Sequence, residues 1–300
     1  MLSAADFSAP PLVEVRDPWL QPYGLRLRML RLDQIHPQIS GNKWYKLSYN
    51  LRAAQAAGQG TLLSFGGAYS NHLVALAAAG RLSGMRTIGV LRGERGQQTN
   101  PRLEFCEQQG MQLHHVSRGD YRRSRDADFI AALHAQFGDF YLIPEGGSNL
   151  QGVRGCMAIA QHLHAAGLGS NSCVALACGT AATLAGLLAG LQGECSVLGV
   201  SVLKGEDTLS AQVREWLALV GREDPCAWTL RTDFHCGGYA KNTPELTQFI
   251  HRFHSVSGIT LEHVYTGKLM LALYTLIAQG QFARGSDLIA LHTGGLSLPR

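Results

Sequence analysis

The chain has 300 residues, of which 46% are hydrophobic and 16% are charged, and its formal net charge is +4. This composition supplies one large core or two smaller ones and excludes a disordered or fibrous protein. The small positive charge gives no reason to expect nucleic-acid binding, because the basic run Arg122–Arg125 leads directly into Asp126 and Asp128 and fits the start of a solvated helix.

The seven cysteines are scattered and never spaced as Cys-x-x-Cys. This distribution suggests neither a disulfide framework nor a zinc ribbon, and it favours a cytoplasmic location. The first residues lack the basic start and apolar block of a secretory signal. The apolar stretch from Cys173 to Leu191 is interrupted by glycines and begins like a buried strand, so we expect no membrane span. No histidine or cysteine pattern predicts a metal site.

From Thr61 onward, short apolar runs alternate with amphipathic segments of helical length, which is typical of a parallel sheet in an α/β protein. Strands are predicted at Thr61–Phe65, Thr87–Leu91, Gln112–Val116, Phe140–Ile143, Cys173–Ala177, Val197–Val202 and Leu288–Leu291. Helices are predicted at Asn71–Leu82, Asn100–Gln109, Asp126–Gln136, Gln151–Ala166, Ala182–Leu191, Thr208–Val220, Pro244–Ser257 and Gly267–Gln279.

The chain has no long polar linker, so a division into two domains requires tight crossings between them. We expect a small domain at residues 49–152, inserted into a large domain formed by residues 1–48 and 153–300.

The first stretch with candidate catalytic residues is Ser40–Leu47, where two lysines lie three residues apart. Lys43 and Lys46 fit surface positions on a helix capped by Asn42. They also fit a catalytic site, since an imine-forming lysine has to be neutral part of the time and a second cation lowers its pKa. These residues alone leave both interpretations open.

Two further stretches each follow a predicted strand and open a helix. Ser64–His72 contains a Gly-Gly pair, and Cys178–Thr183 is rich in small residues and hydroxyls. Glycines allow close backbone approach and helix-start amides favour anions, so both stretches fit a carboxylate or phosphate site. The first also fits a tight turn with Asn71 as the helix cap. The second lacks the lysine of a nucleotide-binding P-loop.

Two motifs near the C-terminus, Tyr265–Lys268 and His292–Gly295, precede the last long helix and follow the last strand. Each one alone fits a helix cap or a turn.

Taken in order, these five stretches resemble the family of 1-aminocyclopropane-1-carboxylate deaminases and D-cysteine desulfhydrases. The similarity extends from about Asp33 to Gly295. It implies an α/β, tryptophan-synthase-β-like fold with two three-layer, parallel-sheet domains, pyridoxal 5'-phosphate in the interdomain cleft, a small amino-acid substrate and a homodimer.

The resemblance also implies a role for each matching residue. Lys43 is expected to hold the cofactor as a Schiff base, and Asn71 to contact the cofactor's phenolic oxygen. The other implied cofactor-binding residues are Asn42, Lys46, Gly179, Thr180, Ala181, Ala182, Thr183, Thr266 and Thr293. The implied catalytic residues are Lys43, Ser70, Tyr239 and Tyr265, and the implied substrate-binding residues are Gly67, Ser70, Asn71 and His72.

Thr266 and Thr293 favour the desulfhydrase branch, because deaminases of the family typically carry Glu and Leu there. A carboxylate at the pyridine nitrogen makes the ring a stronger electron sink, whereas a hydroxyl only hydrogen-bonds it. We therefore predict a lyase that converts D-cysteine to pyruvate, ammonia and sulfide. The alternatives are 1-aminocyclopropane-1-carboxylate deamination, racemisation or another reaction of this fold type, and cofactor binding without catalysis.

Trp44, Tyr45 and Tyr69 depart from the family pattern. They lie beside the expected pocket and bear on the choice of substrate.

Overall fold

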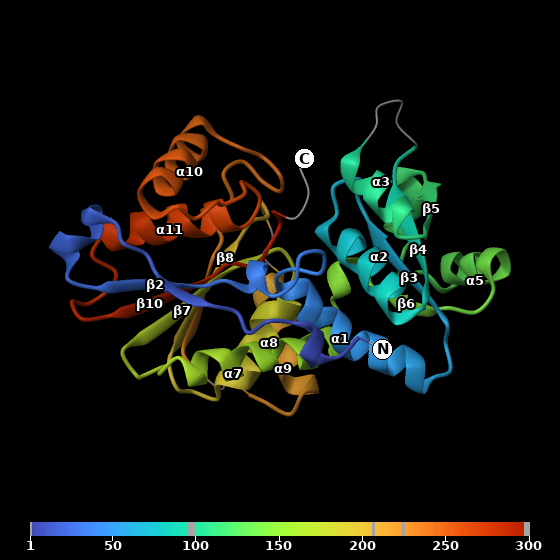
Figure 1. The fold of residues 1–300 in the computed structure, drawn as a ribbon, viewed down its shortest axis with the longest axis horizontal. Coiled ribbons are helices and arrows are strands. Elements are labelled where there is room, and N and C mark those ends of the chain that lie inside the picture. Colours follow the sequence, from blue (N-terminus) through green and yellow to red (C-terminus); the bar gives the residue numbers. More distant parts are fainter. Residues whose placement is uncertain (1, 95–99, 206–207, 224–225, 297–300) are drawn as a thin grey trace.

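The computed structural model describes residues 2–94, 100–205, 208–223 and 226–296. Its strands form two separate sheets (Figure 1). Among the described residues the larger sheet has the order β1 (Leu12–Glu14), β2 (Arg26–Leu30), β10 (Asp287–Leu291), β7 (Ser172–Cys178), β8 (Ser196–Ser201) and β9 (Trp228–Arg231). The smaller sheet has the order β5 (Met111–Val116), β4 (Arg86–Arg92), β3 (Thr61–Gly66) and β6 (Tyr141–Ile143).

All strand pairs given for these sheets are parallel except β1 with β2. The α/β fold expected from the sequence is therefore confirmed, with parallel strands in both sheets.

The described helices lie around these sheets and connect the strands. They are α1 (Asn42–Ala56), α2 (Asn71–Ser83), α3 (Pro101–Gln108), α4 (Arg118–Arg122), α5 (Ala127–Phe137), α6 (Leu150–Cys156), α7 (Ala158–Ala165), α8 (Ala181–Leu191), α9 (Leu209–Leu219), α10 (Pro244–Ser257) and α11 (Thr266–Ala278). Short 3-10 helices occupy Ala4–Asp6, Pro18–Tyr23, Leu32–Gln34 and Glu145–Gly147.

Helices cover both faces of the larger sheet. Helices α10 and α11 lie on one side, and α7, α8 and α9 lie on the other (Figure 1). The central strand β7 is buried along its whole length, with Val174 and Leu176 in one core cluster and Ala175 and Ala177 in the other. A parallel strand packed on both faces needs such a continuous apolar run.

The strands predicted from the sequence are all present, and their ends lie within one residue of the predicted ones. Each predicted helix is also present, but the one expected at Gln151–Ala166 is divided at Met157 into α6 and α7. There the backbone packs closely on two glycines of α8. A Cβ on Gly186 would lie 2.4 Å from the carbonyl oxygen of Val153, and a Cβ on Gly190 would lie 2.6 Å from the carbonyl oxygen of Met157.

The stretch from Cys173 to Leu191 consists of strand β7, a turn and helix α8. Within the described ranges, no helix has the length and apolar character needed to cross a bilayer.

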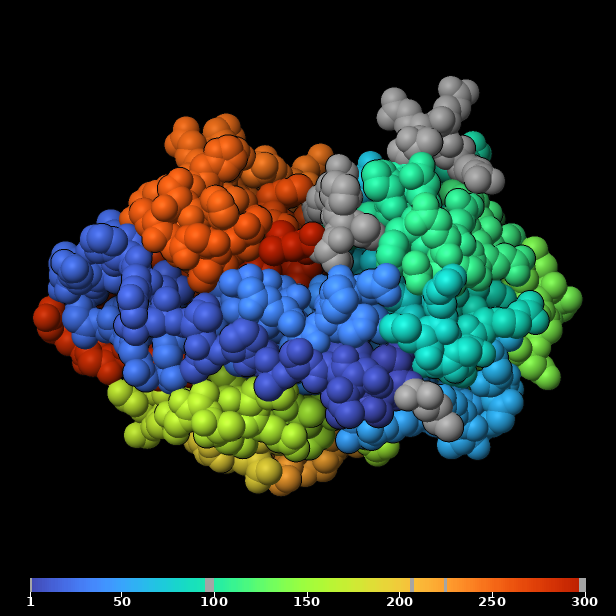
Figure 2. All heavy atoms as spheres, in the orientation of Figure 1, coloured from blue at the N-terminus to red at the C-terminus, as the bar shows by residue number. Residues whose placement is uncertain are grey.

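Helix α1 connects the parts of the chain that build the two sheets. It packs against α2 and α6. Figure 2 shows the blue N-terminal residues running across this face of the molecule, between orange α10 and yellow-green α7. The predicted domain boundary between residues 48 and 49 falls inside this helix. The division into domains stays a prediction.

Candidate active site

A cavity of about 390 Å³ is lined by residues that follow the carboxyl ends of strands in both sheets. This is the usual position of a site in a parallel α/β fold. The cavity brings together most of the predicted site residues, namely Asn42, Lys43, Lys46, Ser70, Asn71, His72, Gly179, Thr180, Thr183, Tyr239, Tyr265 and Thr293. The predicted residues Gly67, Ala181, Ala182 and Thr266 do not line it.

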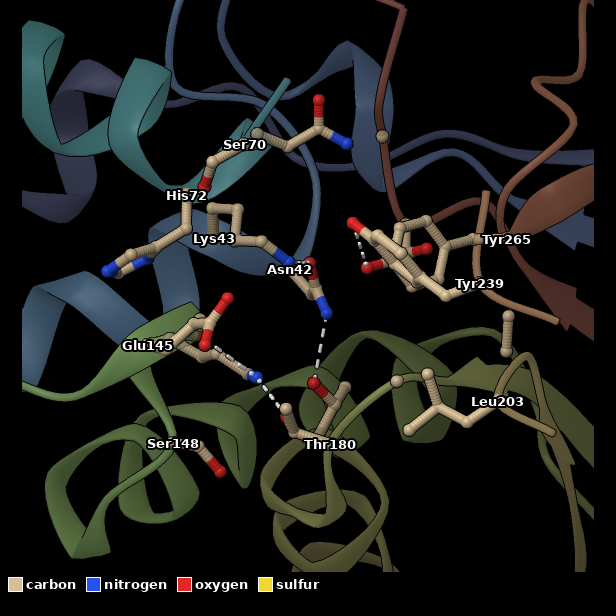
Figure 3. Close-up of a pocket in the computed structure, with 18 of the residues that line it drawn as sticks. Asn42, Lys43, Ser70, His72, Glu145, Ser148, Thr180, Leu203, Tyr239 and Tyr265 are labelled. Atoms are coloured by element: carbon tan, nitrogen blue, oxygen red, sulfur yellow. Dashed lines mark hydrogen bonds between the residues drawn. The ribbon is translucent and has the colours of Figure 1, made fainter. Parts of the chain in front are cut away.

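Lys43 lies in the first turn of α1, and its side chain reaches into the cavity (Figure 3). Its Nζ donates to Asn42 Oδ1 at 2.8 Å. Burial, with the nearby positive charge of Lys46, lowers the pKa of Lys43 to about 7. Near neutral pH roughly half of the amine is therefore uncharged and able to attack a carbonyl.

This low pKa predicts how cofactor loading depends on pH. Only the neutral amine attacks an aldehyde, so the loading rate of cofactor-free protein should rise about tenfold per pH unit below about pH 7 and level off above it. Stopped-flow absorbance after mixing with pyridoxal phosphate measures the profile. Lys46→Met removes the neighbouring charge and should move the midpoint to higher pH; an unmoved midpoint would contradict the electrostatic coupling.

The loop between β7 and α8 has the properties of a phosphate site. Thr180 precedes α8 without capping it through its side chain, so the first amides of the helix are open to an anion. Lys46 Nζ donates to Thr180 Oγ1 and to the Gly146 carbonyl, both at 3.1 Å. Asn42 Nδ2 donates to Thr183 Oγ1 at 2.9 Å, which ties this loop to the helix that carries Lys43.

The start of α2 supplies neutral donors on another side of the cavity. Ser70 caps α2 by accepting from the amide of Leu73 at 3.2 Å. His72 is buried, its Nε2 lies 2.9 Å from Ser64 Oγ, and its Nδ1 has no hydrogen-bond partner among the described residues. Burial and the charges of Lys43 and Lys46 lower the pKa of His72 to about 3, so its ring is neutral.

Two tyrosines lie across the cavity from Ser70 and His72 (Figure 3). The hydroxyl of Tyr265 donates to that of Tyr239 at 3.5 Å. A Cβ on Gly179 would lie 3.0 Å from the Tyr265 ring, which gives a steric reason for glycine at the start of the phosphate loop.

Thr266 has a different environment from the one that the resemblance implies. It is buried, and its hydroxyl contacts Glu262 Oε1 at 3.2 Å and accepts from the Glu262 amide at 3.1 Å. The Glu262 carboxylate also accepts from the amides of Val264, Tyr265 and Thr266 at 2.7 to 2.9 Å. The hydroxyl of Thr266 is thus directed to Glu262, and its contact with the cofactor stays a prediction.

Thr266→Glu would bury a second carboxylate beside Glu262. Because an uncompensated buried charge is costly, we expect the variant to lose about 3 kcal/mol of unfolding free energy at neutral pH, and less in mild acid where one carboxyl is protonated. Urea denaturation of the cofactor-free protein measures this loss. Thr266→Val, which removes the hydroxyl without adding charge, is the control; equal losses in the two variants would contradict the argument.

Several cavity residues were not expected from the sequence, among them Arg92, Arg125, Glu145 and Gln212. Arg92 ends β4 and Glu145 comes two residues after β6, so position at a strand's carboxyl end was a usable signal for both. Arg125 and Gln212 come from a loop and a helix, and no sequence signal distinguishes them from surface residues. Arg92 lies over the Tyr121 ring at 5.6 Å.

These residues fit pyridoxal phosphate. The site combines an amine of low pKa, an uncapped helix start beside Lys46, and a buried His72 nitrogen that lacks a partner among the described residues. Lys43 would hold the aldehyde carbon, and Lys46 with the loop from Gly179 to Thr183 would hold the phosphate. In the described ranges, no three His, Cys, Asp or Glu side chains are grouped as metal ligands.

Comparison with known proteins bears on the cofactor directly. A family model described as "Pyridoxal-phosphate dependent enzyme" matches residues 11–294. The chain belongs to this family. A D-cysteine desulfhydrase of Yersinia pestis (strain Pestoides F) is 30% identical to this pyridoxal-phosphate-dependent enzyme over 282 residues, covering 89% of the chain and 86% of the relative.

Two solved structures extend the comparison of this pyridoxal-phosphate-dependent enzyme. A 1-aminocyclopropane-1-carboxylate (ACC) deaminase homologue superposes with a TM-score of 0.81 at 28% identity, covering 97% of the chain and 90% of the homologue. A hydrogen sulfide-producing enzyme from Fusobacterium nucleatum superposes with a TM-score of 0.69 over 99% and 98% of the two chains, but at 11% identity it shows the fold alone.

The predicted family, fold class and cofactor are therefore confirmed, and the chain is a pyridoxal-phosphate-dependent lyase. The roles of its individual site residues stay predictions.

Proposed function

We propose that this enzyme catalyses elimination at the β-carbon of a small amino acid, converting D-cysteine to pyruvate, ammonia and sulfide. The observation that carries the proposal is the amine of Lys43, with a pKa of about 7, in a cavity shared with the neutral donors of Ser70 and His72. Bound pyridoxal phosphate withdraws electrons from the α-carbon of an amino acid.

The chain's own residues orient the substrate and move protons. Ser70 and neutral His72 bind the carboxylate, which turns the Cα–H bond toward Lys43. Once the substrate amine has replaced Lys43 at the cofactor, the freed Lys43 amine, with its low pKa, takes the α-proton near neutral pH. The Cβ–S bond then breaks with its electron pair on sulfur, and Tyr265 or Tyr239 protonates the leaving sulfide. The remaining aminoacrylate is released and hydrolysed to pyruvate and ammonia.

Two observations support elimination over opening of a cyclopropane ring. Position 266 carries a threonine, and the nearby Glu262 carboxylate already accepts from three backbone amides and the Thr266 hydroxyl. Position 293, which lines the cavity, is also a threonine. A ring nitrogen without a carboxylate partner is a weaker electron sink, which suffices for loss of a thiol.

The deciding experiment supplies cofactor-loaded protein with D-cysteine, L-cysteine and 1-aminocyclopropane-1-carboxylate in parallel. Sulfide and pyruvate are assayed for the cysteines, and ammonia and 2-oxobutanoate for the cyclopropane. We expect equal amounts of sulfide and pyruvate from D-cysteine. Ammonia from the cyclopropane with no sulfide from either cysteine would replace the proposal with ACC deamination.

Location and assembly belong to the same proposal. None of the seven cysteines forms a disulfide, which suits a reducing cytoplasm. A homodimer is expected from the family resemblance. Light scattering on the loaded enzyme measures its mass against the 32.4 kDa of one chain.

A further inference from the structure

Arg102 is a fully buried arginine close to the cavity. It lies in the first turn of α3, and its relative exposure is 1%. The start of α3 is fixed by Asn100, whose Oδ1 accepts from the Arg102 amide at 2.9 Å and whose Nδ2 donates to the Ala68 carbonyl at 3.0 Å. The backbone that carries Arg102 is therefore attached to the turn that opens α2.

The guanidinium of Arg102 joins two segments that are far apart in the sequence. Its Nη1 donates to Asn71 Oδ1, and its Nη2 donates to the Gly295 carbonyl at 3.3 Å. Asn71 begins α2 beside the smaller sheet, whereas Gly295 follows β10 of the larger sheet. Arg102 thus holds Asn71 against the loop that also carries Thr293.

This contact decides which end of the Asn71 amide is offered to the cavity. An arginine has only donors, so the amide oxygen has to face it, and the NH₂ group is left for other partners. Asn71 lines the cavity. Its Nδ2 lies 3.2 Å from the point that a Cβ on Gly295 would occupy, so the bare glycine leaves room for this orientation.

We propose that Arg102 is a positioning residue that acts through Asn71, holding the Asn71 NH₂ group as a hydrogen-bond donor to the cofactor's phenolic oxygen. The inference rests on the proposed function and on the contact of Asn71 with that oxygen, which the family resemblance implies. The positive charge of Arg102 also polarises the amide, which makes its NH₂ group a stronger donor to an anionic oxygen. Without Arg102 the amide is free to turn its oxygen toward the phenolic oxygen.

The test compares Arg102→Met, Asn71→Ala and the double variant. A donor to the phenolic oxygen favours its anionic form, which gives the long-wavelength absorbance band of the lysine-linked cofactor. We expect Arg102→Met to shift absorbance to the short-wavelength band. It should also weaken cofactor binding about tenfold, which corresponds to the loss of one charge-assisted hydrogen bond. Because Arg102 acts through Asn71, the double variant should bind no more weakly than Asn71→Ala alone.

Two further variants separate positioning from general stability. Arg102→Lys keeps a side chain with donors only, so it should restore part of the long-wavelength band. Arg28→Met removes another buried arginine, which pairs with Asp287 in the larger sheet, and should leave the spectrum unchanged even if the protein is less stable.

A wild-type spectrum in Arg102→Met, or additive losses in the double variant, would overturn the inference. If the wild-type protein forms no lysine-linked band with added cofactor, the proposed function fails instead, and the two failures are distinguishable.

Discussion

Lys43→Ala is expected to remove the covalent link to the cofactor and to lower the rate of pyruvate formation from D-cysteine by about 10³-fold or more. A general base alone contributes about 10²-fold to 10⁴-fold, and Lys43 would both hold the cofactor and take the α-proton. Borohydride reduction followed by peptide mapping identifies the labelled lysine in the wild-type enzyme, and an absorbance spectrum reports its loss in the variant.

Lys46→Ala is the matched control for this experiment. Lys46 lines the same cavity, but its Nζ is engaged by Thr180 and Gly146 at the phosphate loop. Its loss should weaken cofactor binding while the label stays on Lys43. Full labelling of the Lys43→Ala protein would move the covalent link to another lysine, with Lys46 in the cavity as the first candidate and buried Lys268, which donates to the Gly238 carbonyl at 2.7 Å, as the second.

The sequence predicted strands such as β7 and β10, which are buried throughout, because burial on both faces leaves an uninterrupted apolar signal. It did not predict β2, whose residues alternate between arginine and apolar side chains. Arg28 in that strand is buried, and it forms a bidentate pair with Asp287 of β10, 259 residues away, and donates to the Ala166 carbonyl. Strand β9 was missed for a different reason: it is short and none of its residues is fully buried.

The site residues also divide into those that a local sequence pattern indicates and those that only the packing of the folded chain brings to the site. Lys43, Ser70 and Thr180 occur in motifs that follow strands or open helices, so the parallel topology brings them to one edge without further information. Arg102 and Glu262 appear in the sequence as ordinary helix or loop charges. Their contacts with Asn71 and Thr266 depend on how the folded segments pack, and a local pattern does not encode that packing.

Thr266 shows the limit of a motif-based assignment. The resemblance connects this residue to the cofactor ring, but the folded chain encloses its hydroxyl with the carboxylate and backbone of Glu262. A motif conveys which residue types recur at a position, whereas the direction of a side chain depends on the neighbours that compete for its hydrogen bonds.

Gly41→Ala is expected to separate the Ser40–Leu47 motif from the His292–Gly295 motif and to cause a large loss of stability. Gly41 has φ +70° and ψ −157°, a conformation nearly exclusive to glycine. A Cβ there would lie 1.9 Å from the carbonyl oxygen of Thr293, an impossible contact. The segment that carries Lys43 would have to move away from the Thr293 loop, and the hydrogen bond from the Asn42 amide to that carbonyl would break.

Gly58→Ala is the matched control, because Gly58 also has φ +70°, but apart from its chain neighbours no atom in the described part of the chain lies within 4 Å of its Cβ position. It should cost about 1 kcal/mol from backbone strain alone, whereas Gly41→Ala should cost about 3 kcal/mol or more. Urea denaturation of the cofactor-free proteins measures both losses, and titration with pyridoxal phosphate should show weaker binding only for Gly41→Ala. Equal losses with unchanged cofactor affinity would mean that contact between the two motifs is not required to assemble the site.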